Sequence, residues 1–345
     1  MSLVGGAPPK LSSPLRSQAV TTEADSPIEI RAADDADLEE IVSVCAKALG
    51  WKSPDFDAAL FRWKHIDNTF GRSLLLVAVE ESDHAKRIVA VRPLMRWQFL
   101  TPTGQTIEAA RAVDTATLPE AQGKGLFRRL TLRGLEMLEA EGCGFVFNTP
   151  NEKSLSGYLS MGWFDAGEVA FGMRLANFRC MARVAQSRSA AEKPSLEVPG
   201  LGIDVPEALG SLTPEMLSTD FASPASLRTA HTVDTLRWRF AGGPISYRYL
   251  PTSDPGNGAI VRVRQRGQIR ELLVAHIIGN SHSAAIETAI NDAMATSNAD
   301  LCVAPHGISK TVRLPKIGPT LALRPLTGAL SPTQFEWMPG DIELF

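Results

Sequence analysis

The hydrophobic pattern in the first part of the chain alternates between the strand period and the helix period. A short strand is predicted at 28–31, and the apolar positions of 34–50 then recur on one helical face that ends at a glycine. A second helical patch at 56–64 leads into two β-rich segments, 74–80 and 87–100. A short polar turn separates these segments, so we predict an antiparallel hairpin.

The middle of the chain combines a strand, a glycine-rich turn and an amphipathic helix in direct succession. Because the pattern changes from period two to a helical stripe across one turn, we expect a loop that joins the end of a strand to the start of a helix. The predicted elements are an interrupted strand at 107–118, a helix at 125–140, a buried strand at 144–147, a short helix at 151–162 and a further strand at 165–179.

The second half of the chain partly repeats the first. The segment Leu236–Phe240 resembles Phe61–His65, which lies 175 positions earlier, and β-rich sequence follows both. A strand at 270–278 and a helix at 283–294 repeat the strand-then-helix order, but the intervening GNSHS has no pair of spaced glycines. We interpret the second half as a degenerate copy that supports or shapes a site in the first half.

Composition divides the chain into two domains and two irregular segments. A chain of 345 residues, 44% of them apolar, is long enough for two domains. Residues 1–26 are rich in Gly, Pro, Ser and Thr, carry no apolar period, and are predicted to form a disordered tail. A change to Ser, Ala, Lys and Pro predicts a linker at 181–202, between a first domain at 27–180 and a second α/β domain at 203–345.

Charge, cysteine usage and hydropathy exclude several classes of protein. Lys and Arg number 35 against 38 Asp and Glu, so no charge excess indicates nucleic acid or an anionic membrane as a partner. We expect neither a metal site nor a disulfide framework, because no C-x-x-C pair and no His at ligand spacing accompany Cys45, Cys143, Cys180 and Cys302. Without a signal-peptide pattern or a long apolar run, the protein is predicted to be soluble and cytoplasmic.

The glycine turn of the central stretch is a candidate phosphate-binding loop. Gln122–Leu126 reads QGKGL and lies between a strand and a helix N-terminus, where free backbone N–H groups and the helix dipole favour a pyrophosphate. It is not a P-loop, because Gly125 stands where Ser or Thr would follow Lys124, and the third glycine of a dinucleotide fingerprint is missing. Taken alone, the loop does not identify its ligand.

A second motif follows at a fixed distance. Its residues keep the spacing N-x-x-[AS]-x-x-x-Y-x-x-x-G-[FW] and are Asn151, Ser154, Tyr158, Gly162 and Trp163. Together with the glycine loop, this motif resembles the GNAT acyltransferase superfamily over about residues 28–180. The resemblance implies an α/β fold with a mixed, mostly antiparallel central sheet flanked by helices, and it makes the chain similar to a tandem-GNAT protein with a degenerate second domain. One departure is Phe127, a bulky residue where the family has a small one.

The resemblance implies acetyl-CoA as co-substrate, with no metal. The loop backbone would hold the CoA pyrophosphate, and the strand before it would supply main-chain contacts to pantetheine. Asn151 is a candidate for a pantetheine contact, or it is only the cap of its helix. The implied cofactor-binding residues are Thr115, Thr117, Leu118, Gln122, Gly123, Lys124, Gly125, Leu126, Phe127, Asn151 and Ser154.

Attack of an amine on a thioester needs a proton for the departing thiolate, and the motif assigns this role to Tyr158. Asp114 is the candidate for the general base or for a group that orients the amine, and Glu108 is a second carboxylate on the same stretch. The sequence does not choose between these two carboxylates. The run Asp114–Pro119 also resembles a subgroup that acylates bacterial glycans or sugar amines.

The predicted function is therefore direct transfer of an acetyl group from acetyl-CoA to the amine of a small molecule or sugar. Two alternatives stay open. A non-catalytic acyl-CoA-binding or regulatory module is favoured by Phe127 and by the lack of a decisive base. An aminoacyl-transferase of the tandem-GNAT type would use aminoacyl-tRNA as donor, and the lack of a basic stripe argues against it. The sequence leaves the oligomeric state open.

Overall fold

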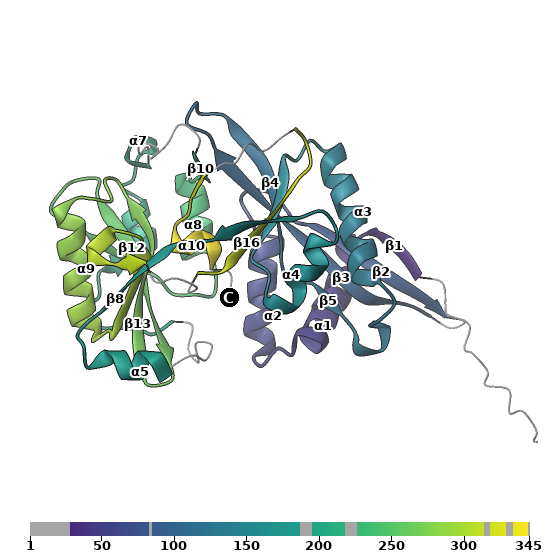
Figure 1. The fold of residues 1–345 in the computed structure, drawn as a ribbon, viewed down its shortest axis with the longest axis horizontal. Coiled ribbons are helices and arrows are strands. Elements are labelled where there is room, and N and C mark those ends of the chain that lie inside the picture. The colour runs from purple at the N-terminus through teal and green to yellow at the C-terminus, as the bar shows by residue number, and fades with distance from the viewer. Residues whose placement is uncertain are drawn as a thin grey trace, which may run out of the picture.

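The computed structural model describes residues 28–82, 85–186, 195–217, 226–313, 318–328 and 334–343. The predicted disordered tail at 1–26 lies outside these residues. In the described ranges the chain forms two β-sheets with their own helices, which lie side by side with the short helix α10 (Pro339–Ile342) between them (Figure 1).

The first sheet confirms the expected mixed, mostly antiparallel arrangement. Neighbouring strands on its main path are antiparallel, except that β4 and β6 are parallel. Its order is β1 (Ile28–Ala32), β2 (Leu74–Ser82), β3 (Ala85–Leu100), β4 (Thr106–Ala112), β6 (Phe145–Asn148), β16 (Thr320–Pro325) and β7 (Phe164–Glu168). Off this path, β5 (Ala116–Thr117) and β10 (Ser226–Thr229) pair with β3, and β17 (Gln334–Glu336) pairs with β10.

Local sequence signals set the helix ends of the first half as predicted. Asp34 accepts hydrogen bonds from the N–H groups of the turn that precedes α1, and Gly50 ends that helix in the left-handed region at φ +67°. Close packing requires a glycine at a second position, because a Cβ on Gly134 of α3 would lie 2.5 Å from Leu94 Cδ1 of β3. The helices are η1 (Asp35–Asp37), α1 (Leu38–Leu49), α2 (Pro54–His65), η2 (Pro119–Ala121), α3 (Leu126–Ala140) and α4 (Glu152–Leu159).

The second sheet has seven strands. Its order is β15 (Val312–Arg313), β8 (Phe171–Leu175), β14 (Leu301–Pro305), β13 (Ile269–Ile278), β12 (Gly258–Arg266), β11 (Arg248–Pro251) and β9 (Ile203–Asp204). The other described helices are α5 (Cys180–Gln186), α6 (Val205–Leu209), α7 (Pro214–Leu217), α8 (Val233–Ala241), α9 (Ala284–Ser297) and η3 (Ile308–Lys310). The predicted strand 270–278 and helix 283–294 correspond to β13 and α9.

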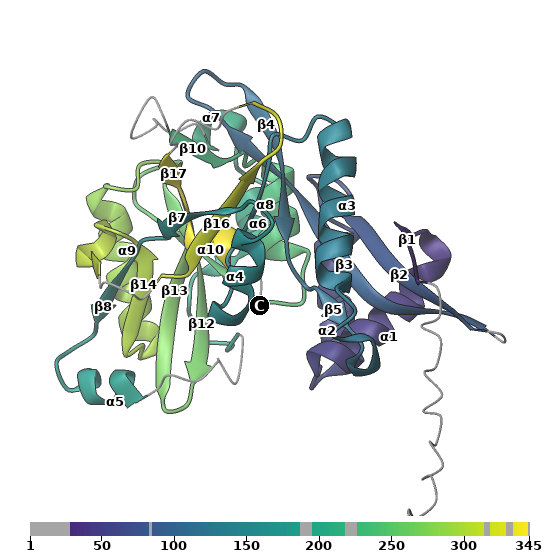
Figure 2. The ribbon, with the colours of Figure 1, turned by 45° about the vertical axis from the view of Figure 1, so that its right-hand side comes forward.

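On their main paths the two sheets repeat one topology, and each path includes one strand from the other half. Read from β1 and from β9, both orders give three antiparallel pairs, one parallel pair and two antiparallel pairs. The sixth place of the first sheet is filled by β16 from the second half, which Figure 2 shows beside β7, and the sixth place of the second sheet is filled by β8 from the first half. The expected further strand at 165–179 is thus two strands, β7 and β8, in different sheets. The division at 181–202 stays a proposal about folding units.

A paired tryptophan joins the two repeats. Trp63 of α2 and Trp238 of α8 stack at 5.2 Å between ring centroids, and each Nε1–H donates to the carbonyl oxygen of the other residue, at 2.8 Å and 3.0 Å. This reciprocal contact is what a two-fold relation between the halves produces, and both residues are buried in the core. The core cluster around them draws aromatic side chains from both sheets, so the halves share one buried interior.

Two features are absent from the described parts of the chain. None of the helices there has the length and apolar character needed to cross a membrane. In the same residues, no three His, Cys, Asp or Glu side chains gather in a way that could hold a metal ion.

Candidate active site

The candidate site lies where β4 and β6 stop pairing. Their parallel register covers Ala109–Arg111 and Phe145–Phe147, and beyond it neither strand pairs with the other. On its other side, β4 pairs with β3, and after β4 the chain returns to pair with β3 again as β5. Between these two pairings, Pro93 of β3 pairs with Leu75 and has no partner in β4 or β5. At Pro93 the pairing of the central strand β3 is therefore interrupted on this side. We call this break in the pairing, beside Val113–Thr115, the opening.

Asp114 lies in the left-handed region at φ +48°, a conformation that costs free energy for a residue other than glycine. Its Oδ2 contacts Lys64 Nζ and lies 2.9 Å from His65 Nε2, and His65 Nδ1 lies 2.9 Å from Ser73 Oγ. Burial raises the pKa of Asp114, but Lys64 and His65 outweigh it, so the net pKa lies well below the usual range. Burial is also the main reason why the pKa of His65 is lowered. An ionised Asp114 suits an orienting role better than a basic one.

Tyr158 lies on α4 and is 4% exposed. Its hydroxyl oxygen accepts a hydrogen bond from Arg92 Nη1 at 3.0 Å, and the same Nη1 donates to Thr115 Oγ1. The Phe127 ring packs edge-on against the Tyr158 ring at 5.3 Å between centroids. The structure therefore brings together Tyr158, Thr115 and Phe127, three residues from separate predicted elements.

The glycine loop opens α3 as predicted. Gly123 and Gly125 have φ values of +79° and +69°, so both positions favour glycine. Within the described residues, the backbone N–H groups of Gly123, Gly125 and Leu126 donate no hydrogen bond. The Lys124 side chain turns back and its Nζ lies 3.0 Å from Glu80 Oε1. The loop thus offers unpaired backbone donors at a helix N-terminus, which suits an anionic phosphate group.

The strand before the loop is partly satisfied already. Leu118 N–H donates to the Val89 carbonyl at 2.9 Å, and the Thr117 carbonyl accepts from Gln122 Nε2 at 3.4 Å. A pantetheine contact with the Thr117 carbonyl would therefore compete with the Gln122 side chain.

Three predicted residues have local roles in this structure. Asn151 Oδ1 accepts from Ser154 N–H at 3.0 Å and Ser154 Oγ donates to the Asn151 carbonyl, so both cap the start of α4. Glu108 lies at the other end of β4, exposed and bonded to Gln98 Nε2 at 2.8 Å. It precedes Asp114 by six residues, roughly 20 Å along an extended chain. The structure therefore does not bring Glu108 to Tyr158.

Sequence reasoning missed three side chains at the opening, Arg92, Lys64 and His65. Arg92 is the one charged residue in the otherwise apolar run 88–95, which is an unusual pattern and could have marked it. Lys64 and His65 belong to the repeated FRWKH segment, to which the sequence assigned no role in the site. Their contact with Asp114 spans about 50 residues and has no local signal.

The second half reaches the opening through α10. Arg111 of β4 donates to the carbonyl oxygens of Asp341 at 2.8 Å and Ile342 at 2.6 Å, and to Thr149 Oγ1 at 3.2 Å. Because Arg111 is the last residue of β4 that pairs with β6, this contact fixes α10 beside the opening.

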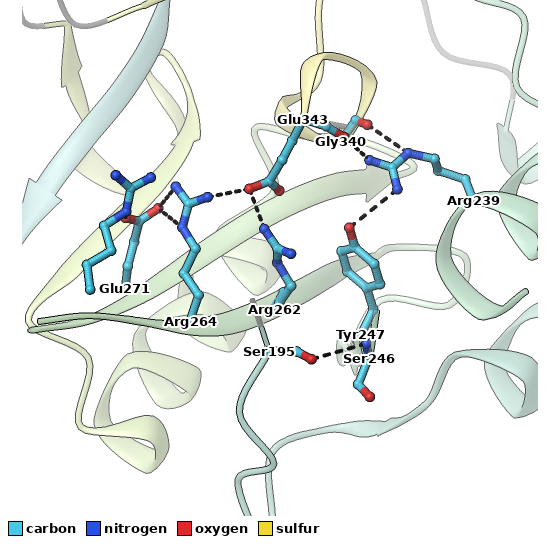
Figure 3. Close-up of polar contacts among 10 residues, drawn as sticks. Ser195, Arg239, Ser246, Tyr247, Arg262, Arg264, Glu271, Gly340 and Glu343 are labelled. Atoms are coloured by element: carbon cyan, nitrogen blue, oxygen red, sulfur yellow. Dashed lines mark hydrogen bonds and ion pairs between the residues drawn. The ribbon is translucent and has the colours of Figure 1, made fainter. Parts of the chain in front are cut away.

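A cluster of arginines holds the end of the same segment (Figure 3). Glu343 contacts Arg262 and Arg264 of β12, and Arg239 Nε donates to the Gly340 carbonyl at 2.9 Å. The segment after β17 is therefore tied to both halves of the molecule.

A cavity of about 1140 Å³ lies elsewhere, at the end of β13. Its lining includes His231, His276 and Asp341, but none of the residues predicted for catalysis or acetyl-CoA binding. His231 Nε2 lies 2.9 Å from Asp341 Oδ1, and burial is the main reason why the pKa of His276 falls to about 3. We do not assign the cavity to the reaction at the opening.

Comparison with known proteins identifies the first half. Residues 29–165 match the model of the GNAT acetyltransferase domain. A search of curated proteins gives no significant match.

Solved structures resemble both halves together. A probable N-acyltransferase of unknown function from Enterococcus faecalis shares 11% identity at a TM-score of 0.60, over 87% of this chain and 73% of its own. A GCN5-related N-acetyltransferase from Kribbella flavida shares 13% at 0.52, over 87% and 72%. Eis1 from Mycobacterium abscessus shares 17% at 0.50, over 87% and 74%. Residues 29–165 therefore form a GNAT acetyltransferase domain.

Proposed function

We propose that the protein transfers an acetyl group from acetyl-CoA directly to the amine of a small molecule or sugar. The observation that carries the proposal is the position of the Tyr158 hydroxyl and Thr115, which share one hydrogen-bond donor beside the opening. The strand that continues from Thr115 leads into a loop with unpaired backbone donors. A proton donor at one end and an anion cradle at the other suit an acyl thioester of CoA.

The residues of the loop fit the pyrophosphate of CoA. The N–H groups of Gly123, Gly125 and Leu126 would hold it, and the absence of side chains at the two glycines lets a phosphate approach the backbone. When bound, acetyl-CoA supplies an activated acyl group. The chain supplies position, charge and a proton.

Tyr158 and Asp114 divide the work at the opening. Tyr158 would donate its hydroxyl proton to the departing sulfur. Asp114 is held as an anion by Lys64 and His65, whose contacts fall on Oδ2, so Oδ1 is the oxygen that would orient the amine. A low pKa makes Asp114 a weak base, and we expect the amine to lose its proton to solvent.

The test combines binding with turnover. A thermal-shift titration with acetyl-CoA should raise the unfolding midpoint with saturation, and thiol release should then be measured over a panel of small amines and amino sugars. Thiol release that depends on an amine supports the proposal. Stabilisation without thiol release would favour an acyl-CoA-binding or regulatory module, and no response to acetyl-CoA would favour another donor, such as aminoacyl-tRNA.

A further inference from the structure

Arg92 is a fully buried cation in the middle of the first sheet. Its exposed fraction is 0%, and no carboxylate of the described residues forms a salt bridge with it. Its Nε and Nη2 atoms are buried and have no hydrogen-bond partner in the described parts of the chain. Burying a guanidinium without a counter-ion is costly, so a stability role alone does not explain this residue.

Within the described residues, both side-chain hydrogen bonds of Arg92 go to the predicted site. Both come from one atom, Nη1, which donates to Thr115 Oγ1 on the strand side and to the Tyr158 hydroxyl on the helix side. The guanidinium carbon lies 5.3 Å from the centre of the Tyr158 ring and 5.4 Å from that of Phe127. Arg92 thus fixes two sides of the opening relative to each other.

A guanidinium is a donor only, and this decides the direction of the hydrogen bond. The Tyr158 oxygen must accept from Arg92, so its own hydroxyl hydrogen cannot point at Arg92 and is available to another acceptor. A nearby fixed cation also stabilises the phenolate that remains when this hydrogen leaves. We propose that Arg92 is the positioning residue that turns Tyr158 into a proton donor, an inference that rests on the proposed acyl transfer.

The amine nitrogen forms a bond to the acyl carbon with its lone pair, and the carbon–sulfur bond breaks with its electron pair on sulfur. The sulfur takes the hydroxyl proton of Tyr158, which leaves a phenolate beside Arg92. The former amine nitrogen loses a proton to solvent, and the phenolate takes one back from solvent.

Phe127 completes the arrangement and explains its departure from the small residue of the family. Its ring lies edge-on to Tyr158 and under the Arg92 guanidinium. A Cβ on Gly157 of α4 would lie 3.3 Å from Phe127 Cε1, so the glycine makes room for the ring. Phe127 therefore packs against Gly157, Tyr158 and Arg92, and the bulky residue is part of the site.

The test measures kcat and acetyl-CoA affinity separately in Arg92 variants, with the amine of the panel that gives the fastest thiol release. Arg92→Met should lower kcat by about 30-fold or more, in the range of general acid catalysis, and change the acetyl-CoA Kd by less than about threefold. Arg92→Lys keeps the charge and should recover part of the lost kcat. In the Tyr158→Phe background, Arg92→Met should lower kcat by less than about threefold, because the residue acts through Tyr158.

Arg248→Met is the control, since Arg248 lies on β11 of the second sheet and pairs with Asp204 of the same sheet. It should leave kcat near the wild-type value. Wild-type kcat in Arg92→Met, or equal losses with and without the Tyr158 hydroxyl, would overturn the role of Arg92 while leaving acyl transfer intact. If Arg92→Met does not fold, the same comparison is made with Arg92→Lys. Absence of thiol release in the wild type would overturn the proposed function and this inference with it.

Discussion

The loops before α3 and α9 occupy the same topological place in the two halves but differ in what their backbone can bind. In the first loop, the N–H groups of Gly123 and Gly125 have no partner in the described residues. In the second, Asn280 N–H donates to Asn257 Oδ1 at 2.8 Å and His282 N–H donates to Asn280 Oδ1 at 3.0 Å. A side chain of the second half thus occupies the place that a ligand would need.

The same contrast holds for the buried His–Asp pairs. In the first half, His65 and Asp114 lie at the opening, and a third group, Lys64, fixes the charge. In the second half, His231 pairs with Asp341, whose own carbonyl is bound by Arg111 of the first half. The comparison indicates that one repeat keeps its polar groups available for chemistry, while the other uses them to hold the two halves together.

The largest expected effect comes from removing one tyrosine hydroxyl group in each half and comparing the two variants. Tyr158→Phe should reduce turnover by about 100-fold or more, because it removes the proposed proton donor, and should leave acetyl-CoA affinity nearly unchanged. Tyr249→Phe makes the same chemical change in the second half, where the hydroxyl only donates to the Asn257 carbonyl at 3.3 Å. Steady-state kinetics measure the turnover of both variants. An equal loss of turnover in both variants, or full turnover in Tyr158→Phe, would contradict the proposed difference between the halves.

The second prediction concerns acid stability and His276. Its pKa is about 3 in the folded protein, mainly because of burial, with His231 as the next cause, against about 6.5 in the unfolded chain. The unfolded state therefore binds more protons between these values, and stability falls as pH drops through this window. From pH 7 to pH 5 we expect a loss of about 2 kcal/mol from this residue.

Urea unfolding of His276→Gln at several pH values checks this expectation. The variant should show a flatter dependence than the wild type over the same window. His282→Gln changes an exposed histidine of the same half and should keep the wild-type dependence. An unaltered pH dependence in His276→Gln would mean that the buried imidazole is not a source of acid sensitivity.

A third prediction compares the two glycine loops directly. Gly125→Ala should weaken acetyl-CoA binding by about tenfold, because alanine strains a backbone at φ +69° and crowds the cradle. A Cβ there meets no atom within 4 Å, so the fold should persist. Gly279→Ala should destabilise the fold, since its Cβ would lie 2.0 Å from Asn257 Oδ1, without changing acetyl-CoA affinity. Calorimetric titration with acetyl-CoA measures the affinity of both variants. Weaker binding in Gly279→Ala together with unchanged binding in Gly125→Ala would assign the ligand to the second loop.

The smallest expected effect tests the symmetry of the junction. Trp63→Phe and Trp238→Phe each remove one of two reciprocal hydrogen bonds, so each should cost about 1 kcal/mol of unfolding free energy. The double variant should cost less than the sum, because the two residues are in contact. Chemical denaturation gives the three values, and strongly unequal single costs would argue against an equivalent role in the two repeats.

Local signals carried much of the fold. The hairpin of β2 and β3, the cap of η1 at Asp34 and the start of α3 after Gly125 all follow from neighbouring residues. The distance between the loop and Tyr158 is also a property of the sequence, since one helix and one strand connect them. For this reason, the sequence alone predicted the superfamily, the loop and the proton donor.

The partners of these residues could not be found in the same way. Arg92 meets Tyr158 across 66 positions, Lys64 and His65 meet Asp114 across about 50, and Arg111 meets Ile342 across 231. Such contacts depend on which strands lie side by side, and the hydrophobic periodicity of the sequence does not show which strands are neighbours. Glu108 shows the opposite case. It lies near Asp114 in the sequence, but the extended strand between them holds the two residues far apart.

The sequence by itself determined the elements, the glycine loop with its motif, and the presence of a second, degenerate half. Only the tertiary structure decided that each half completes the other's sheet, through β8 and β16, and that α10 is held against the opening by Arg111. The physical reason is that a strand can bury its backbone groups against any suitable edge. Its composition shows that it is a strand, whereas its neighbours are set by the packing of the whole chain.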